Sequence, residues 1–173
     1  MIVWLVGLSG AGKTTIAKEL HRRWQGKEAG TILIDGDEFR EIFQHVRGEA
    51  AHTVEGRRLN GERIVATCAW LDSQNINAVV SILCLFPDML AANRSRYSGY
   101  FEAFIDCPLP DLEARDGKGL YAAARKGEMA NVVGIDIPFP RPTQPDLVIN
   151  NDGPSLDAAA IATTILAMIR VEP

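Results

Sequence analysis

The feature that most constrains the fold is a glycine-rich stretch directly behind an apolar run. Residues Ile2–Val6 are all apolar, and positions 7–14 read Gly-Leu-Ser-Gly-Ala-Gly-Lys-Thr. A short apolar run that ends at a glycine is typical of a buried strand, and apolar residues then recur at helical spacing up to Gly26. The order strand, loop, helix, combined with the pattern G-x-x-x-x-G-K-[ST], predicts a phosphate-binding loop.

Each residue type in this loop has a chemical reason. Glycines let the backbone turn so that successive N–H groups point at crowded phosphate oxygens. Lys13 is expected to reach the β- and γ-phosphates, and the hydroxyl of Thr14 to bind Mg²⁺. A glycine-rich turn that binds nothing is the alternative, but it has no need of a lysine followed by two threonines. The loop residues expected to bind a nucleoside triphosphate are Gly7, Ser9, Gly10, Ala11, Gly12, Lys13, Thr14 and Thr15.

Length, charge and cysteine usage exclude several classes of protein. The 173 residues, 47% of them hydrophobic, suffice for one well-buried core, so 1–173 is expected to be a single domain. A net charge of −4 gives no basic field for nucleic acid, and no apolar run is long enough to span a membrane. Cys68, Cys84 and Cys107 lie far apart in or beside apolar segments, which favours buried thiols over disulfides or a metal site. We therefore expect a cytoplasmic protein with a small-molecule substrate.

Apolar strands and helices alternate along the chain. Near-continuous apolar strands separated by helices indicate a parallel sheet covered on both faces. A polar, irregular stretch is expected at 40–55, and Pro154 is expected to open a final helix with Ser155 as its N-cap. The predicted fold class is α/β, a three-layer α/β/α arrangement of the P-loop NTPase type with a mainly parallel sheet. The five expected strands are 2–6, 31–35, 78–83, 100–106 and 146–149.

The segment from about 116 to 145 differs in composition from its surroundings. It is rich in Gly, Lys, Arg and Pro, with only a short helical piece at 120–126. A long, irregular, cationic segment in a compact domain is usually functional. It is expected to be a lid that excludes water from the transferred phosphoryl group. A solvated, proline-rich loop is the alternative.

A pair of carboxylates closes the second expected strand. Asp35 and Asp37 flank a glycine there, and ligands collect at the carboxyl ends of parallel strands. One acid can order Mg²⁺ or its water shell while the other accepts a proton from an acceptor hydroxyl. Asp37 is better placed to reach a substrate, although it can also serve as the N-cap of a helix that begins at Glu38.

Four arginines follow these carboxylates, at 40, 57, 58 and 63. Any single one is best explained as a solvated surface residue. As a set in an acidic protein, they indicate an anionic second substrate.

The chain resembles the adenylylsulfate (APS) kinases from residue 6 to about residue 151. These enzymes phosphorylate the 3′-hydroxyl of APS with MgATP to give PAPS and ADP. The most specific segment reads Ala-Arg-Asp-x-Lys-Gly-Leu-Tyr at 114–121. The other matching segments are the phosphate-binding loop at 7–15, Asp-Gly-Asp-Glu-Phe-Arg at 35–40, Arg57-x-x-Asn60, Arg63-Ile64, and Gly-Ile-Asp-x-Pro at 134–138.

The resemblance implies ATP and Mg²⁺ as cofactors and assigns a role to each matching residue. Asp37 and Lys13 would be catalytic, with Asp37 at the reacting hydroxyl, and Thr14 and Asp35 would bind the metal. Arg115 and Lys118 would bind the nucleotide from the lid. The family commonly forms homodimers, although no segment here identifies an interface. The residues that would bind the acceptor are Asp37, Arg40, Arg57, Asn60, Lys118, Gly119 and Leu120.

Two departures from the family pattern affect the acceptor. Phe86 stands where the family commonly has a serine that has been described as a phosphorylated intermediate, so direct in-line transfer is expected. Val132 stands where a family phenylalanine stacks on the adenine of the acceptor. The stacking, about 1–3 kcal/mol per base, is lost unless Phe86 or Phe139 replaces it.

Three hypotheses follow. The first is an APS kinase. The second is the same chemistry on another anionic hydroxyl acceptor, such as a sugar or a polysaccharide precursor, because the departures fall on the adenine side of the acceptor pocket. The third is a nucleotide-binding regulatory module, against which stand the absence of a guanine-selecting Asn-Lys-x-Asp sequence and the presence of two carboxylates where binding needs fewer.

Overall fold

The structure is a computed structural model that describes residues 1–43, 48–152 and 156–169. Its strands are β1 (Ile2–Val6), β2 (Thr31–Asp35), β3 (Asn77–Ile82), β4 (Tyr100–Asp106) and β5 (Leu147–Asn150). Its helices are α1 (Lys13–Gln25), α2 (Gly36–Phe43), the 3₁₀ helix η1 (Gly48–His52), α3 (Val54–Ser73), α4 (Pro87–Arg96), α5 (Leu109–Ala114), α6 (Leu120–Arg125) and α7 (Ala158–Met168).

The strands form one parallel sheet in the order β2-β3-β1-β4-β5. The predicted α/β class is thus confirmed, and each expected strand is present with its ends shifted by at most one residue. The chain leaves β1 toward β2 on one side and later returns to β4 on the other. This reversal next to β1 is where a parallel sheet offers a crevice to ligands.

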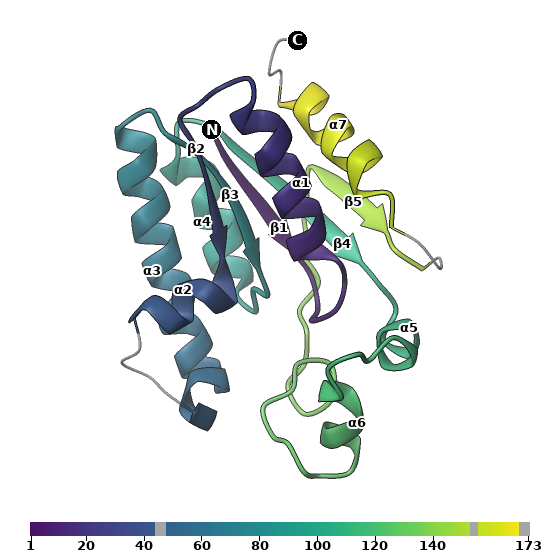
Figure 1. The fold of residues 1–173 in the computed structure, drawn as a ribbon. Coiled ribbons are helices and arrows are strands. Elements are labelled where there is room, and N and C mark those ends of the chain that lie inside the picture. The colour runs from purple at the N-terminus through teal and green to yellow at the C-terminus, as the bar shows by residue number, and fades with distance from the viewer. Residues whose placement is uncertain (44–47, 153–155, 170–173) are drawn as a thin grey trace.

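Helices cover both faces of the sheet (Figure 1). Side chains of β1 alternate between the two faces, as the pleat requires. Trp4 packs in a core with α3 and α4, whereas Val3 and Leu5 pack in a second core with α1 and α7. All five residues of β1 are fully buried, which explains why this strand is a continuous apolar run.

The carboxyl ends of the strands lie at one end of the molecule (Figure 1). Helix α2 follows β2 at this end, and α5, α6 and the loop after α6 lie there too. The phosphate-binding loop, between β1 and α1, therefore faces the predicted lid.

The stretch 40–55, expected to be irregular, is largely helical. Helix α2 continues to Phe43, η1 spans Gly48–His52, and α3 begins at Val54, while residues 44–47 lie outside the described residues. Thr53 is the N-cap of α3, because its hydroxyl accepts a hydrogen bond from the N–H of Gly56 at 3.1 Å. The apolar residues of this stretch, among them Ile42, Phe43 and Val54, follow no continuous helical spacing, so the sequence did not indicate these helices.

Two helices and two helix starts also differ from expectation. Helices α4 and α5 were not predicted, and each has a proline in its first turn, where the missing N–H costs nothing. Helix α2 begins at Gly36 and not at Glu38, so Asp37 lies in its first turn. The N-cap of α7 is Asp157, whose carboxylate accepts from the N–H of Ala160, and Ser155 lies outside the described residues.

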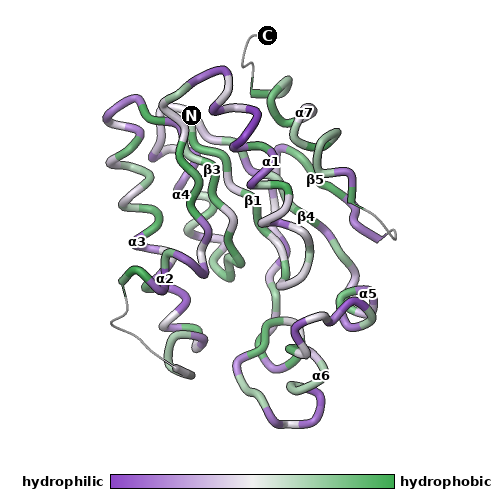
Figure 2. Tube along the Cα trace, viewed as in Figure 1, coloured by the Kyte–Doolittle hydropathy of each residue, from purple (hydrophilic) through white to green (hydrophobic). Residues whose placement is uncertain are grey.

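The predicted lid segment has an exposed and a buried part. Its helix α6 is present as expected, and residues 125–130 are exposed. Val132 and Val133, in contrast, are each 3% exposed and pack in the two cores. Figure 2 shows hydrophilic stretches alternating with hydrophobic ones around α5 and α6. The exposed residues of this segment thus lie on both sides of the buried pair, at 125–130 before it and at positions such as Pro138 and Arg141 after it.

The cysteines are buried and unpaired, as predicted. Within the described ranges, no helix combines the length and the apolar character that crossing a membrane requires.

Candidate active site

The phosphate-binding loop takes a conformation that favours glycine. Gly10 and Gly12 have φ angles of 76° and 95°, in the left-handed region. A Cβ on Gly12 would lie 2.7 Å from Cδ2 of Leu156, and one on Gly7 would lie 2.6 Å from the carbonyl oxygen of Ile105. The loop therefore packs closely against Ile105 at its start and against Leu156 at its end.

Side chains hold three carbonyl groups of this loop. Lys13 Nζ donates to the carbonyl of Leu8 at 2.7 Å, and the hydroxyl of Tyr121 donates to that of Ser9 at 2.8 Å. Nδ2 of Asn151 donates to the carbonyl of Ala11 at 3.0 Å. The first N–H groups of α1 have no partner within the helix, so they are available to an anion at its N-terminus.

Two adjoining cavities open at the loop. One, of about 360 Å³, extends toward α2 and α3 and is called the acceptor cavity below. The other, of about 340 Å³, extends toward α5 and α6 and is called the nucleotide cavity. Both are lined by Ser9, Gly10, Lys13, Thr14, Lys118 and Leu120.

Most of the predicted residues line one cavity or both. Gly12, Thr15 and Arg115 line the nucleotide cavity. Gly7, Ala11 and Gly119 are not among the lining residues of either cavity. The predicted residues that line only the acceptor cavity are Asp35, Asp37, Arg40, Arg57 and Asn60.

Lys13 is poised to bind an anion. Burial lowers its pKa to about 8; Lys118 lowers it too, whereas Asp37 and Asp35 act against this shift. Its only hydrogen bond among the described contacts goes to a neutral carbonyl. A phosphate oxygen would be a stronger partner, because both groups would then be charged.

The hydroxyl and carboxylate groups needed for a divalent cation lie together at the ends of α1, β2 and β3. Thr14 Oγ1 donates to Asp35 Oδ2 at 2.7 Å and lies 3.3 Å from the Oγ of Ser81. Ser81 is opposite Asp35 in the β2–β3 register and is 3% exposed. Such oxygen atoms fit Mg²⁺, which prefers hard ligands and few protein groups. Ser81 was missed in the sequence, where a single serine inside an apolar strand gave no signal.

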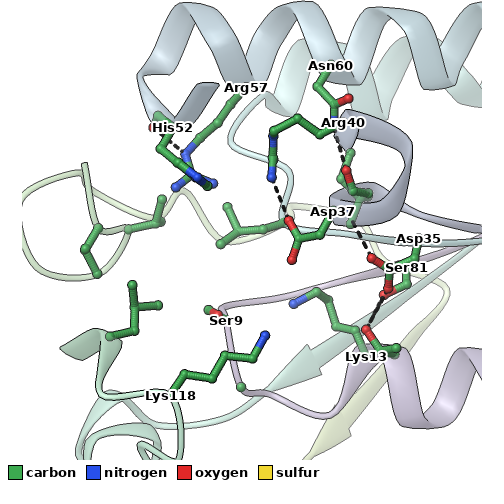
Figure 3. Close-up of a pocket in the computed structure, with 18 of the residues that line it drawn as sticks. Ser9, Lys13, Asp35, Asp37, Arg40, His52, Arg57, Asn60, Ser81 and Lys118 are labelled. Atoms are coloured by element: carbon green, nitrogen blue, oxygen red, sulfur yellow. Dashed lines mark hydrogen bonds and ion pairs between the residues drawn. The ribbon is translucent and has the colours of Figure 1, made fainter. Parts of the chain in front are cut away.

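Asp37 lies between two groups of side chains that carry nitrogen atoms (Figure 3). Arg40, Arg57 and His52 lie on one side of its carboxylate, and the ammonium groups of Lys13 and Lys118 on the other. Burial would raise the pKa of Asp37, but the hydrogen bond from Arg40, at 2.7 Å, and the nearby cations lower it below its usual 3.8. The carboxylate is therefore ionised at neutral pH.

Arg40 and Arg57 retain capacity for an anion. Nε of Arg40 is buried and has no hydrogen-bond partner among the described residues. Arg57 donates to the carbonyls of His52 and Asn131, at 2.8 and 3.0 Å, and forms no ion pair with a carboxylate in the described part of the chain. Burial and the charge of Arg40 lower the pKa of Arg57. Two partly desolvated guanidinium groups side by side favour a bound anion.

The other two arginines serve the protein surface. Arg58 lies 4.2 Å above the ring of Phe86 and pairs with Asp88, and Arg63 lies over the ring of Phe43. Asn60, predicted to bind the acceptor, is 4% exposed and donates to the carbonyl of Gly36 at 2.9 Å. It thereby fastens α3 to the start of α2.

No phenylalanine replaces the missing stacking ring among the described lining residues. Phe86 is buried beneath Arg58, and Phe139 stacks on Phe104 with ring centroids 6.1 Å apart. Neither ring therefore supplies the stacking surface that the valine at position 132 lacks. The acceptor cavity has Leu83, Met129 and Val132 as apolar lining, and His52 as its one aromatic ring in the described chain. His52 was missed because an isolated histidine in a polar stretch carries no pattern.

The parallel sheet, the loop and the ionised Asp37 define a P-loop kinase. The sequence model of the adenylylsulphate kinase family matches residues 1–150, so the chain belongs to this family. Its members transfer a phosphoryl group to a hydroxyl acceptor, and the match supports the use of ATP.

The names of individual relatives indicate different acceptors. The cytidine diphosphoramidate kinase of Campylobacter jejuni is 39% identical over 150 residues, which are 87% of this chain and 85% of the relative. The adenylyl-sulfate kinase of Paraburkholderia xenovorans is 37% identical over 154 residues, 87% of this chain and 83% of the relative. The Mycobacterium tuberculosis APS kinase CysC, solved in complex with AMPPNP and APS, superposes with a TM-score of 0.84 at 31% identity, covering 97% of this chain and 96% of that one.

Proposed function

We propose that the protein transfers the γ-phosphoryl group of ATP to a hydroxyl of an anionic nucleotide, and that APS is the first acceptor to test. The products would be PAPS and ADP. One observation carries the proposal: the carboxylate of Asp37 lies in a single cavity between the lysines of the phosphate side and Arg40 and Arg57. A regulatory nucleotide-binding module has no need of this second half of the cavity.

On the nucleotide side, the loop N–H groups and Lys13 would hold the β- and γ-phosphates. Thr14 and Asp35, with Ser81 beside them, would hold Mg²⁺, which when bound supplies positive charge to the bridging and terminal phosphate oxygens. Lys118 lines both cavities and is therefore placed to contact the group in transfer. Arg115 would contact the nucleotide from the start of the lid.

On the acceptor side, Arg40 and Arg57 would bind the anionic 5′ group, and Asp37 would accept a hydrogen bond from the reacting hydroxyl. The lowered pKa makes Asp37 a weak base, so its main contribution is to orient the hydroxyl and take the proton late in the transfer. Phe86 has no hydroxyl to phosphorylate, which supports direct in-line transfer.

A cytidine nucleotide with an anionic 5′ group is a second candidate acceptor, favoured by the aliphatic lining of the acceptor cavity. A purine loses more than a pyrimidine when an aromatic ring is absent, because its stacking area is larger. Burial, together with the charges of Arg40 and Arg57, lowers the pKa of His52 below its usual 6.5. The imidazole is then neutral at pH 7. One of its nitrogens can donate a hydrogen bond to a base edge, and the other can accept one from it. The similarity to a cytidine diphosphoramidate kinase agrees with this candidate.

The test measures ADP release and identifies the product. The purified protein receives MgATP alone, with APS, or with cytidine diphosphoramidate, and kcat/KM is compared between the acceptors. Asp37→Asn should lower kcat by about 10²–10⁴-fold while nucleotide binding stays within about threefold. Asp88→Asn is the matched control, because Asp88 is an exposed carboxylate with an arginine partner outside the cavity. ATP binding without acceptor-dependent ADP release would refute both candidates, and undiminished turnover of the Asp37 variant would refute its role.

Acceptor identity also decides the finer assignments. If APS is the acceptor, the protein acts in sulfate assimilation, for which we propose a cytoplasmic location. We also propose a homodimer and a single domain over 1–173. Light scattering at working concentration measures the assembly.

A further inference from the structure

The segment that follows β5 contacts the phosphate-binding loop. Asn151 is the first residue after this strand, and it is 5% exposed. Its N–H donates to the carbonyl of Asp106 at 2.8 Å, which fixes its backbone to the end of β4. It lies one residue beyond the part of the chain that the family model matches. The backbone of Asn151 is therefore held in place, which fixes where its side chain begins.

The side-chain amide joins two parts of the nucleotide site. Nδ2 donates to the carbonyl of Ala11 in the loop at 3.0 Å. Arg115 donates from Nη1 to Oδ1 of Asn151 at 3.5 Å and from Nη2 to its carbonyl at 3.3 Å. Arg115 directly follows α5 and lines the nucleotide cavity. One buried amide thus donates a hydrogen bond to the loop and accepts one from Arg115, the residue just before the lid segment.

The contact to Ala11 matters because of the direction of peptide dipoles. The loop binds phosphate through N–H groups, so any carbonyl that turned inward would repel the anion. Of the three carbonyls held by side chains, that of Leu8 loses its donor when Lys13 moves to a phosphate. Tyr121 and Asn151 would then be the side chains that still hold loop carbonyls.

We propose that Asn151 is a positioning residue for the nucleotide, which keeps the Ala11 carbonyl turned away from the phosphates and holds Arg115 at the nucleotide cavity. The proposal rests on the proposed function in one respect, the role of Arg115 as a nucleotide contact. It assigns a role in binding to a residue that touches no reacting atom.

The test measures binding of MgAMPPNP by calorimetry in the absence of any acceptor. Asn151→Ala removes the side-chain contacts to Ala11 and to Nη1 of Arg115 and keeps the backbone carbonyl that accepts from Nη2, whereas Asn151→Asp keeps an acceptor for Nη1 and places a carboxylate against the Ala11 carbonyl. Asn93→Ala is the matched control, because Asn93 is a fully buried asparagine on α4, away from both cavities. Arg115→Ala and the double variant with Asn151→Ala complete a thermodynamic cycle.

Asn151→Ala should raise the Kd for the nucleotide about fivefold to tenfold, the size of one lost buried hydrogen bond with a weaker second one. Asn151→Asp should weaken binding at least as much, because it loses the donor and adds negative charge. Arg115→Ala should weaken binding less in the Asn151→Ala background than in the wild type. With an active acceptor, the KM for ATP should rise while the KM for the acceptor stays unchanged.

Three results would overturn the proposal. The first is a folded Asn151→Ala or Asn151→Asp protein that binds the nucleotide within about twofold of the wild type. The second is a double variant whose fold-increase in Kd equals the product of the fold-increases in Asn151→Ala and Arg115→Ala. The third is an equal loss in Asn93→Ala, since the effect would then be one of general stability. A wild-type protein that binds no nucleotide would instead refute the proposed function, so the two failures are distinguishable.

Discussion

The pKa of Lys13 predicts that MgATP binding weakens as the pH rises through about 8. Burial strips water from the ammonium group, and this cost lowers the pKa. Bound phosphates would raise it again, because they stabilise the charged form. Binding must then take up a proton whenever Lys13 is neutral in the free protein. The affinity for MgATP is therefore highest below the pKa of Lys13 in the nucleotide-free protein. It declines as the pH rises above this value, until the pH reaches the pKa of Lys13 in the nucleotide-bound protein.

The size of the change in nucleotide affinity follows from the pKa of Lys13 in the nucleotide-free protein alone. Relative to low pH, the apparent Kd should rise by a factor of about 1 + 10^(pH − 8), which is roughly 1.1 at pH 7, 2 at pH 8 and 11 at pH 9. The phosphates of ATP are already fully ionised across the upper part of this range. An increase of about tenfold in the apparent Kd between pH 7 and pH 9 would thus come from deprotonation of Lys13 and not from the nucleotide.

Calorimetry in two buffers with different ionisation enthalpies measures both the Kd and the number of protons taken up. At pH 8, MgAMPPNP should bind with uptake of about half a proton. Lys13→Arg should bind more weakly but without this pH dependence, because a guanidinium stays charged. Lys118→Arg should retain the dependence. A flat Kd with no proton uptake between pH 7.5 and 9 would refute the reasoning, and so would an unchanged slope in Lys13→Arg.

Three further outcomes are expected. Gly7→Ala should cost roughly 2–4 kcal/mol of unfolding free energy, measured by urea titration, because its Cβ would meet the Ile105 carbonyl at 2.6 Å; a cost below about 1 kcal/mol would contradict the close packing. Asp35→Asn should raise the Mg²⁺ concentration needed for half-maximal activity by about tenfold or more, and an unchanged requirement would exclude it as a ligand. Burial raises the pKa of Cys68 and Cys84 to about 12, so neither thiol should react with a disulfide reagent at pH 8 until urea unfolds the protein.

The sheet and the loop could be predicted from sequence because their signals are local. A buried parallel strand is a short apolar run, and the loop needs its glycines, lysine and threonine at fixed spacing. Each strand was located to within one residue on this basis. Helices α4 and α5 escaped because proline, a helix breaker in the interior, is favoured in the first turn.

The walls of the site could not be predicted because they depend on contacts between distant segments. Ser81 and His52 come from different elements, and neither belongs to a pattern in its own neighbourhood. Under the proposed function, His52 and the apolar lining residues of the acceptor cavity would matter most, since they would contact the base of the acceptor. Spacing along the chain carries no information about which of these residues meet in space.

The acceptor half of the cavity is assembled from side chains that each have a structural task as well. Arg40 holds Asp37 through Nη1 while its Nε is unpartnered among the described residues. Asn60 holds Gly36 through Nδ2 while its Oδ1, by the same measure, has no partner. Arg57 holds the carbonyls of η1 and of the segment after α6. The spare donors and acceptors are thus fixed in place by hydrogen bonds formed on folding, so an acceptor that matches them binds without first having to order the site. Such preorganisation favours one acceptor over close analogues, because a molecule that lacks one polar group leaves a buried partner unpaired.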